Sequence, residues 1–353
     1  MQRIVTFLTC CALLFAATAA EAGDTVKVYI LAGQSNMEGK AQNKLWEYQA
    51  TAPETQDFFA HLRDGEQWIE RDDVFIKFLN RKGPLTLGFG SRDRTGSEFE
   101  FGYVMGEYHD DPVLLIKTAW GGHSLYKSFR SSSNPPPTDM LTAELQRRIE
   151  RTKNENAKRN RNDPLPTLES IRDEYGVSYR NMIKEVETVR AELATLFPEL
   201  RGKQFELSGF FWFQGWNDQY NGAETEYEAN MRHFINDVRK DLDAPQLPFV
   251  IAVMGQNQSQ PAQGAMKTIQ DAQLKMETLP EFRGNVKAVR TDVLVDQAAE
   301  QLYPTWKDNV ERWEQVGSDH PYHYLGSAIW YTRIGRASAE ALIELQETAA
   351  SNE

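Results

Sequence analysis

Four short segments of the chain hold residue types that suit nucleophilic catalysis. They are Gly33-Gln34-Ser35, Gly121-Gly122-His123-Ser124, Gly215-Trp216-Asn217-Asp218 and Ser318-Asp319-His320-Pro321-Tyr322-His323. A serine after a tight turn can attack a carbonyl carbon, and a nearby histidine can take its proton. Glycine N–H groups and an asparagine amide can donate to the oxyanion that forms. Together, the four segments indicate acyl transfer.

Each segment also has a structural interpretation when it is taken alone. Ser35 would make a good helix N-cap, and Met37 replaces the second glycine of the Gly-x-Ser-x-Gly elbow. The glycine and Asn-Asp sequences are common in turns. His320 and His323 with Asp319 suggest a metal site, but a metal needs more ligands, and the proline between the histidines opposes a regular helix. We therefore expect no metal at this segment.

The elements that must position these residues follow from the hydrophobic pattern. Five apolar stretches predict strands: Val26–Leu31, Val113–Ala119, Leu207–Phe213, Phe249–Met254 and Val286–Thr291. Stretches with helical spacing are Ser178–Leu196, Glu224–Leu242 and Ser327–Leu345. Because strands alternate with helices, we expect a doubly wound, mostly parallel α/β sheet. The first three segments follow predicted strands, and ligands bind outside the carboxyl ends of the strands in such sheets.

Two polar regions, near residues 41–100 and 124–165, interrupt this alternation. The first contains KGPLTLGFGSRDRTG, which we predict to be a long loop. The second contains three consecutive prolines, which exclude a helix interior, and then the charged run RRIERTKNENAKRNRND, which we predict to be a solvated helix or loop. Both regions follow candidate active-site turns, where α/β folds carry substrate loops. We interpret them as inserts.

Composition and the amino terminus restrict the class of protein. Of 353 residues, 41% are hydrophobic, and the formal net charge is −12, which favours an ordered globular enzyme and argues against a nucleic-acid partner. Residues 1–22 combine Arg3, an apolar run and Ala20-Glu21-Ala22, the pattern of a secretory signal peptide that is short for a membrane span. Both cysteines, Cys10 and Cys11, lie there, so the mature chain would have no thiol.

The order and wording of the four segments resemble a known superfamily. Gly-Gln-Ser, a glycine turn, Gly-x-Asn-Asp and a C-terminal histidine form the block pattern of SGNH hydrolases. ILAGQSNMEG, TAWGGHSL, WFQGWND and YHYLGSA are similar to the sialate O-acetylesterase branch of carbohydrate esterases. The resemblance implies a three-layer α/β/α sandwich with a mostly parallel five-stranded, flavodoxin-like sheet. It also implies one catalytic domain over residues 23–353.

The resemblance further implies roles for individual residues. Ser35 would be the nucleophile, and its N–H would form an oxyanion hole with the Gly122 N–H and the Asn217 amide. His323 would be the general base, and no cofactor would be needed. Two positions depart from the family pattern. His320 stands where the family usually has the acid, which leaves Asp319, Asp292 or a backbone carbonyl to orient the imidazole, and Trp216 stands where the sugar esterases often have glutamate.

The function that follows is a secreted or periplasmic carbohydrate esterase with no stable membrane insertion. It would remove O-acetyl groups from a mono-, oligo- or polysaccharide. Two alternatives remain open from the sequence. One is a general esterase or lipase of the same fold, which would need an open apolar groove. The other is a non-catalytic carbohydrate-binding protein.

Overall fold

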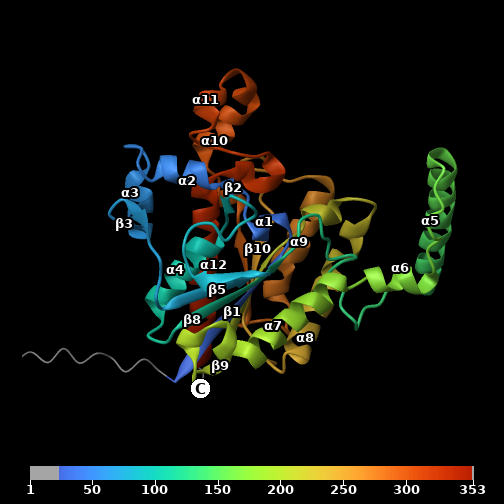
Figure 1. Ribbon diagram of the computed structural model, residues 1–353, viewed down its shortest axis with the longest axis horizontal. Helices are drawn as coiled ribbons and strands as arrows, with labels where there is room; N and C mark the ends of the chain where they lie inside the picture. Colours follow the sequence, from blue (N-terminus) through green and yellow to red (C-terminus); the bar gives the residue numbers. More distant parts are fainter. Residues whose placement is uncertain (1–23, 352–353) are drawn as a thin grey trace, which may run out of the picture.

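A seven-stranded sheet forms the centre of the protein, whose computed structural model describes residues 24–351 (Figure 1). Its strands are β1 (Thr25–Gly33), β5 (Val74–Phe78), β6 (Arg81–Pro84), β8 (Val113–Ala119), β9 (Gln204–Phe213), β10 (Phe249–Val253) and β11 (Val286–Arg290). The order across the sheet is β11-β10-β9-β1-β8-β5-β6. All neighbouring strands are parallel except β5 and β6, which are antiparallel.

The five strands expected from the sequence are all present, and they lie side by side in the flavodoxin-like order 2-1-3-4-5. The expected strand number was wrong, because β5 and β6 extend the sheet beyond β8 to make seven strands. Both additions come from the polar region near residues 41–100, and β6 overlaps the start of the stretch that was predicted to be a long loop. β5 has only five residues and includes Lys77, so its apolar run was too short and too interrupted to stand out.

Helices cover both faces of the sheet and make the outer layers of a three-layer sandwich (Figure 1). One face carries α4 (Glu98–Tyr108) and α12 (Ala328–Ala350), and the other carries α7 (Val177–Leu196), α8 (Tyr227–Asp241) and α9 (Gly264–Thr278). β1 lies at the centre and alternates between the two cores. Its Tyr29 and Leu31 face α4 and α12, whereas Val28 and Ile30 face the other helices.

Shorter elements complete the described part of the chain. The remaining α-helices are α1 (Ser35–Glu38), α2 (Asn43–Gln49), α3 (Gln56–Phe59), α5 (Thr138–Arg159), α6 (Leu168–Glu174), α10 (Gln297–Leu302) and α11 (Val310–Trp313). The 3₁₀ helices include η3 (Trp216–Gln219), η5 (Asp292–Leu294), η6 (Tyr303–Asp308) and η7 (Pro321–Gly326). Two small antiparallel pairs join β2 (Ala41–Gln42) to β7 (Arg94–Thr95) and β3 (Arg63–Asp64) to β4 (Gln67–Trp68).

The charged run in the second polar region is helical. It forms most of α5, which extends away from the sheet together with α6 (Figure 1). Leu141 is the buried residue of α5, so the helix is solvated along most of its length. The predicted signal peptide, residues 1–22, lies outside the described residues. Within residues 24–351, none of the helices has the length and apolar character that crossing a membrane requires.

The register of the central strands aligns three of the candidate segments. Gly33, the last residue of β1, pairs with Ala119 at the end of β8 and with Phe213 at the end of β9. The turns after these three strands therefore start at the same edge of the sheet. This edge includes the position between β1 and β9, where the chain order reverses and ligands bind in doubly wound folds.

Candidate active site

The turn after β1 is tight because a glycine meets a neighbouring strand. A Cβ atom on Gly33 would lie 2.2 Å from the carbonyl oxygen of Phe213, so a larger residue would push β1 and β9 apart. Helix α1 begins directly after this turn, but Gln34 is its N-cap residue, and Ser35 is its first helical residue rather than the N-cap that its residue type suggested. The helix has only four residues. Any anion beside Ser35 must therefore be stabilised by individual N–H groups rather than by a long helix dipole.

Four of the predicted site residues line one cavity of about 470 Å³. Its lining residues are Ser35, Lys40, Gly121, Gly122, Trp216, Asn217, Tyr220, Tyr322 and His323. Gly122 has a φ of +80°, and a Cβ atom there would lie 3.6 Å from Asn217 Nδ2, so this glycine turn and the asparagine amide are neighbours. Segments from the ends of β1, β8 and β9 and from the C-terminal region thus meet where their chemistry would be needed.

His323 has a carboxylate beside it. Its Nδ1 lies 3.2 Å from Asp319 Oδ2, although the two groups are not aligned as a hydrogen bond. Arg94 Nη1 donates to the same carboxylate oxygen at 2.6 Å, and the His320 N–H donates to Oδ1 at 2.8 Å. Burial raises the pKa of Asp319, but His323, the His320 N–H and Arg94 together hold it at about 2. Asp319 is therefore ionised at any ordinary working pH.

The other acid considered from the sequence lies elsewhere. Asp292 is in η5 and forms an ion pair with Arg290. Of the two candidate acids, Asp319 is the one next to the imidazole, at the position four residues before the histidine. His320, which stands at the family's usual acid position, instead has its Nδ1 2.9 Å from the hydroxyl of Tyr303.

An unusual turn accounts for this spacing. Tyr324, Leu325 and Gly326 have φ values of +55°, +58° and +56°, so three successive residues after His323 are left-handed. The turn brings the carbonyl oxygen of Leu325 back to accept from the N–H groups of Ser318 (2.8 Å) and Asp319 (3.0 Å). The closure of this loop therefore sets the distance between Asp319 and His323. On a regular helix, two side chains four residues apart would instead be brought together by the helical repeat.

Gln34 connects the turn that carries Ser35 to the turn that carries Asn217. Its Oε1 accepts from the N–H groups of Gly215 and Asn217, both at 3.3 Å, and from Gln214 Nε2 at 3.2 Å. The buried Asp218 extends this connection to the glycine turn. It accepts from Leu125 N at 2.9 Å and Tyr126 N at 2.7 Å, and burial raises its pKa to about 6. These two side chains connect three of the candidate segments to one another.

Glu38 supports the glycine turn directly. Its Oε1 accepts from the Gly121 N–H at 2.6 Å, while Lys40 Nζ and Ser91 Oγ contact its Oε2 at 2.6 and 2.9 Å. Burial raises the pKa of Glu38, but these donors lower it below its usual value. Beneath α1, the fully buried Lys117 donates to the carbonyl oxygen of Glu38 at 2.9 Å. The helix that carries Ser35 is therefore held at its C-terminal end.

The roles of these supporting residues do not follow from the sequence. Gln34 and Glu38 lie within the ILAGQSNMEG motif, so proximity to Ser35 was the one available signal for them. Arg94 lies in the stretch predicted to be a loop, and Lys117 is a single polar residue inside a predicted strand. Their partners are up to 225 residues away in the chain, as for Arg94 and Asp319, and no local pattern predicts such contacts.

Comparison with known proteins decides the family. The model of the family described as carbohydrate esterase, sialic acid-specific acetylesterase matches residues 25–162 and 167–303, which is more than half of the chain. The chain belongs to this family. The resemblance predicted from the motifs is confirmed, and the matched ranges include Ser35, Gly122 and Asn217. Asp319 and His323 lie beyond the end of the match.

Three solved structures are similar to this carbohydrate esterase at low sequence identity. An Arabidopsis thaliana protein determined at 1.6 Å resolution has a TM-score of 0.50 and 15% identity, with 90% of this chain and 98% of that chain covered. A carbohydrate acetylesterase from Xanthomonas citri has a TM-score of 0.42 and 13% identity, covering 76% and 50% of the two chains. NanS has a TM-score of 0.42 and 12% identity, covering 76% and 78%. No curated protein sequence matches the chain.

Proposed function

We propose that this carbohydrate esterase removes O-acetyl groups from sugars through an acyl-enzyme, with Ser35 as nucleophile and His323 as general base. The observation that carries the proposal is the convergence of Ser35, Gly122, Asn217 and His323 on one cavity. The position of Asp319 at His323 Nδ1 supports it, because a carboxylate there holds the ring and stabilises the imidazolium. Residues 23–353 would form a single catalytic domain.

The reaction would proceed in two steps. Ser35 Oγ attacks the acetyl carbonyl carbon while its proton moves to His323 Nε2, and the electron pair of the C=O bond becomes the oxyanion. The N–H groups of Ser35 and Gly122 and the side-chain amide of Asn217 donate to that oxyanion. The C–O bond to the sugar then breaks, and His323 returns the proton to the sugar oxygen. In the second step water attacks acetyl-Ser35 in the same way and acetate leaves.

The lining of the cavity suits a sugar better than an acyl chain. Lys40, Asn217 and the hydroxyl groups of Tyr220 and Tyr322 offer polar contacts, and the ring of Trp216 lies 6.0 Å from that of Tyr322. An aromatic surface beside polar groups is complementary to a pyranose, which has apolar C–H faces and hydroxyl edges. Export to the periplasm or the medium, predicted from residues 1–22, would place the enzyme among extracellular glycans.

The proposal is tested by acetate release from a panel of acetylated glycans. We expect the parent protein to release acetate and to be labelled at Ser35 by a serine-directed phosphonate. Ser35→Ala and His323→Ala should each lose about 10⁴-fold or more of kcat, because the nucleophile and base act as one unit. Circular dichroism would show that both variants are folded.

Each alternative function predicts a different result. A general esterase or lipase would hydrolyse acyl esters with a preference for chain length and would not discriminate among acetylated sugars. A non-catalytic carbohydrate-binding protein would bind sugars in calorimetry without acetate release and without phosphonate labelling. Hydrolysis that survives Ser35→Ala at the parental rate would overturn the mechanism.

A further inference from the structure

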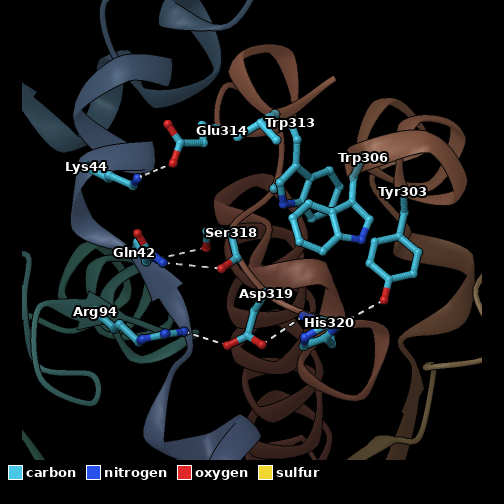
Figure 2. A pocket seen from close by; sticks show the side chains of 12 residues that line it. Gln42, Lys44, Arg94, Tyr303, Trp306, Trp313, Glu314, Ser318, Asp319 and His320 are labelled. Carbon is cyan, nitrogen blue, oxygen red and sulfur yellow. Dashed lines mark hydrogen bonds and ion pairs between the residues drawn. The ribbon is translucent and has the colours of Figure 1, made fainter. Parts of the chain in front are cut away.

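A second cavity, of about 230 Å³, is lined in part by the segment Ser318-Asp319-His320 (Figure 2). One wall consists of Tyr303, Trp306 and Trp313 from η6 and α11. The facing wall carries polar side chains, among them Lys44 and Arg94 (Figure 2). We call this cavity the aromatic pocket. Its walls come from segments far apart in sequence.

The aromatic wall is a packed group of rings with unused donors. The ring centroids of Tyr303 and Trp313 are 5.5 Å apart, and those of Trp306 and Trp313 are 6.3 Å apart. Trp313 is 6% exposed and anchors the group, whereas Trp306 is only partly buried and lines the pocket. Neither indole N–H donates a hydrogen bond to any residue of the described range 24–351.

A row of rings joins the aromatic pocket to the catalytic cavity. His320 lines the pocket, and its ring stacks on that of Tyr322 with centroids 5.2 Å apart and planes at 27°. Tyr322 lines the catalytic cavity, and its ring lies 4.5 Å from that of His323. Both His320 and Tyr322 are exposed. A ligand that fills both cavities can therefore lie across this row of side chains.

The charges of the pocket are balanced. Lys44 Nζ lies 2.7 Å from a carboxylate oxygen of Glu314, and Arg94 lies 2.6 Å from Asp319. Each cation that lines the pocket thus has its own anion, so an anionic sugar gains no unpaired positive charge there. An aromatic wall opposite a neutral, polar wall is complementary to an uncharged pyranose, whose C–H face packs on the rings and whose hydroxyls meet the polar groups.

We propose that the aromatic pocket is a subsite for a neutral sugar unit adjacent to the one that carries the acetyl group. The enzyme would then act on oligo- or polysaccharides in preference to acetylated monosaccharides. This inference rests on the proposed function, because it assigns the neighbouring unit of the same substrate. Trp306 would supply the principal stacking surface of the subsite.

The test compares acetate release from acetylated monosaccharides and tetrasaccharides of xylose, glucose, mannose and galactose. For at least one sugar, the parent should show kcat/KM about tenfold higher for the tetrasaccharide, the effect of one good aromatic contact. Trp306→Ala should remove this preference. Val310→Arg, which would fill the pocket from a residue that is 47% exposed, should do the same without deleting a packed ring. Tyr48→Ala, an exposed aromatic outside both cavities, is the matched control and should retain it.

Three results would overturn the subsite. They are the absence of a tetrasaccharide preference for all four sugars, its survival in both pocket variants, and a stronger preference for acetylated tetragalacturonate than for every neutral tetrasaccharide. Failure of the proposed function is separately visible, because it removes acetate release from every glycan. In that case calorimetry with the deacetylated neutral tetrasaccharides still tests whether the aromatic pocket binds sugar. Binding that weakens about tenfold in Trp306→Ala supports the subsite, and no binding by the parent refutes it.

Discussion

Replacing Glu38 tests whether the glycine turn must be held for catalysis. Glu38 contacts the Gly121 N–H, one residue before the N–H proposed to bind the oxyanion, and it is 17% exposed. A hydrogen bond to a charged group contributes about 1.5–3 kcal/mol. If loss of this hydrogen bond in Glu38→Ala raises the activation free energy by that amount, kcat should fall by roughly 10- to 100-fold. This stays below the 10²–10³-fold cost of deleting an oxyanion donor outright.

The assay is hydrolysis of p-nitrophenyl acetate, a substrate small enough to depend little on sugar contacts. We expect Glu38→Ala to lower kcat with little change in KM, and Glu38→Gln to recover much of the rate because its amide oxygen can still accept from Gly121. Glu185→Ala is a matched control, since Glu185 is 22% exposed and pairs with Lys77 away from the site. A parental kcat in Glu38→Ala, or an equal loss in Glu185→Ala, would refute the reasoning.

Three further predictions follow from buried or ionised groups. Asp319→Asn should lower kcat by about 10²–10⁴-fold, while the kcat of Asp292→Asn should stay within about twofold of the parent. The reverse order would show that Asp319 is not the acid that orients His323. Lys117→Met leaves Glu98 as an unpaired buried charge and should lower the free energy of unfolding, measured in urea, by about 3–5 kcal/mol. The double variant Lys117→Met/Glu98→Gln should recover most of that loss, and an equal loss in the single and double variants would contradict this. Burial lowers the pKa of His109 to about 4, so between pH 6.5 and 4 the unfolded chain binds a proton that the folded chain does not, and the free energy of unfolding falls as pH falls. On going from pH 7 to pH 4, His109→Gln should therefore lose about 1–2 kcal/mol less of its free energy of unfolding than the parent, after allowance for partial exposure. A difference between variant and parent that stays constant across pH would disprove this.

The main fold could be predicted because its core strands are nearly continuous apolar runs. Such runs are typical of parallel strands with both faces covered, and three of the five ended where a chemically suggestive segment began. The two edge strands lacked this signal. β6 reads Arg-Lys-Gly-Pro, which indicates a turn more than a strand, and it is antiparallel at the edge, where pairing on one side suffices.

The partners of the site could not be predicted to the same degree. Ser35, Asn217 and His323 stand out through residue type and order, but the acid beside His323 depends on the path of the backbone. Bulky residues rarely adopt positive φ, so nothing in the sequence Tyr324-Leu325 indicates a left-handed turn. The contacts of Gln34 with residues about 180 positions away are equally invisible, because they arise only when β1 and β9 pair.

The left-handed turn after His323 also bears on how this esterase would lose activity. Two of its three residues, Tyr324 and Leu325, are not glycine. A left-handed backbone conformation at each of them costs about 1–3 kcal/mol, which the surrounding structure must offset. Tyr324 is held through its hydroxyl, which accepts from the Gly255 N–H at 3.0 Å and lies 2.9 Å from Thr291 Oγ1. The segment carrying the imidazole is thus kept in place by tertiary contacts against its own backbone preference. Loss of these contacts would release the segment that carries the proposed general base while the central sheet stays paired.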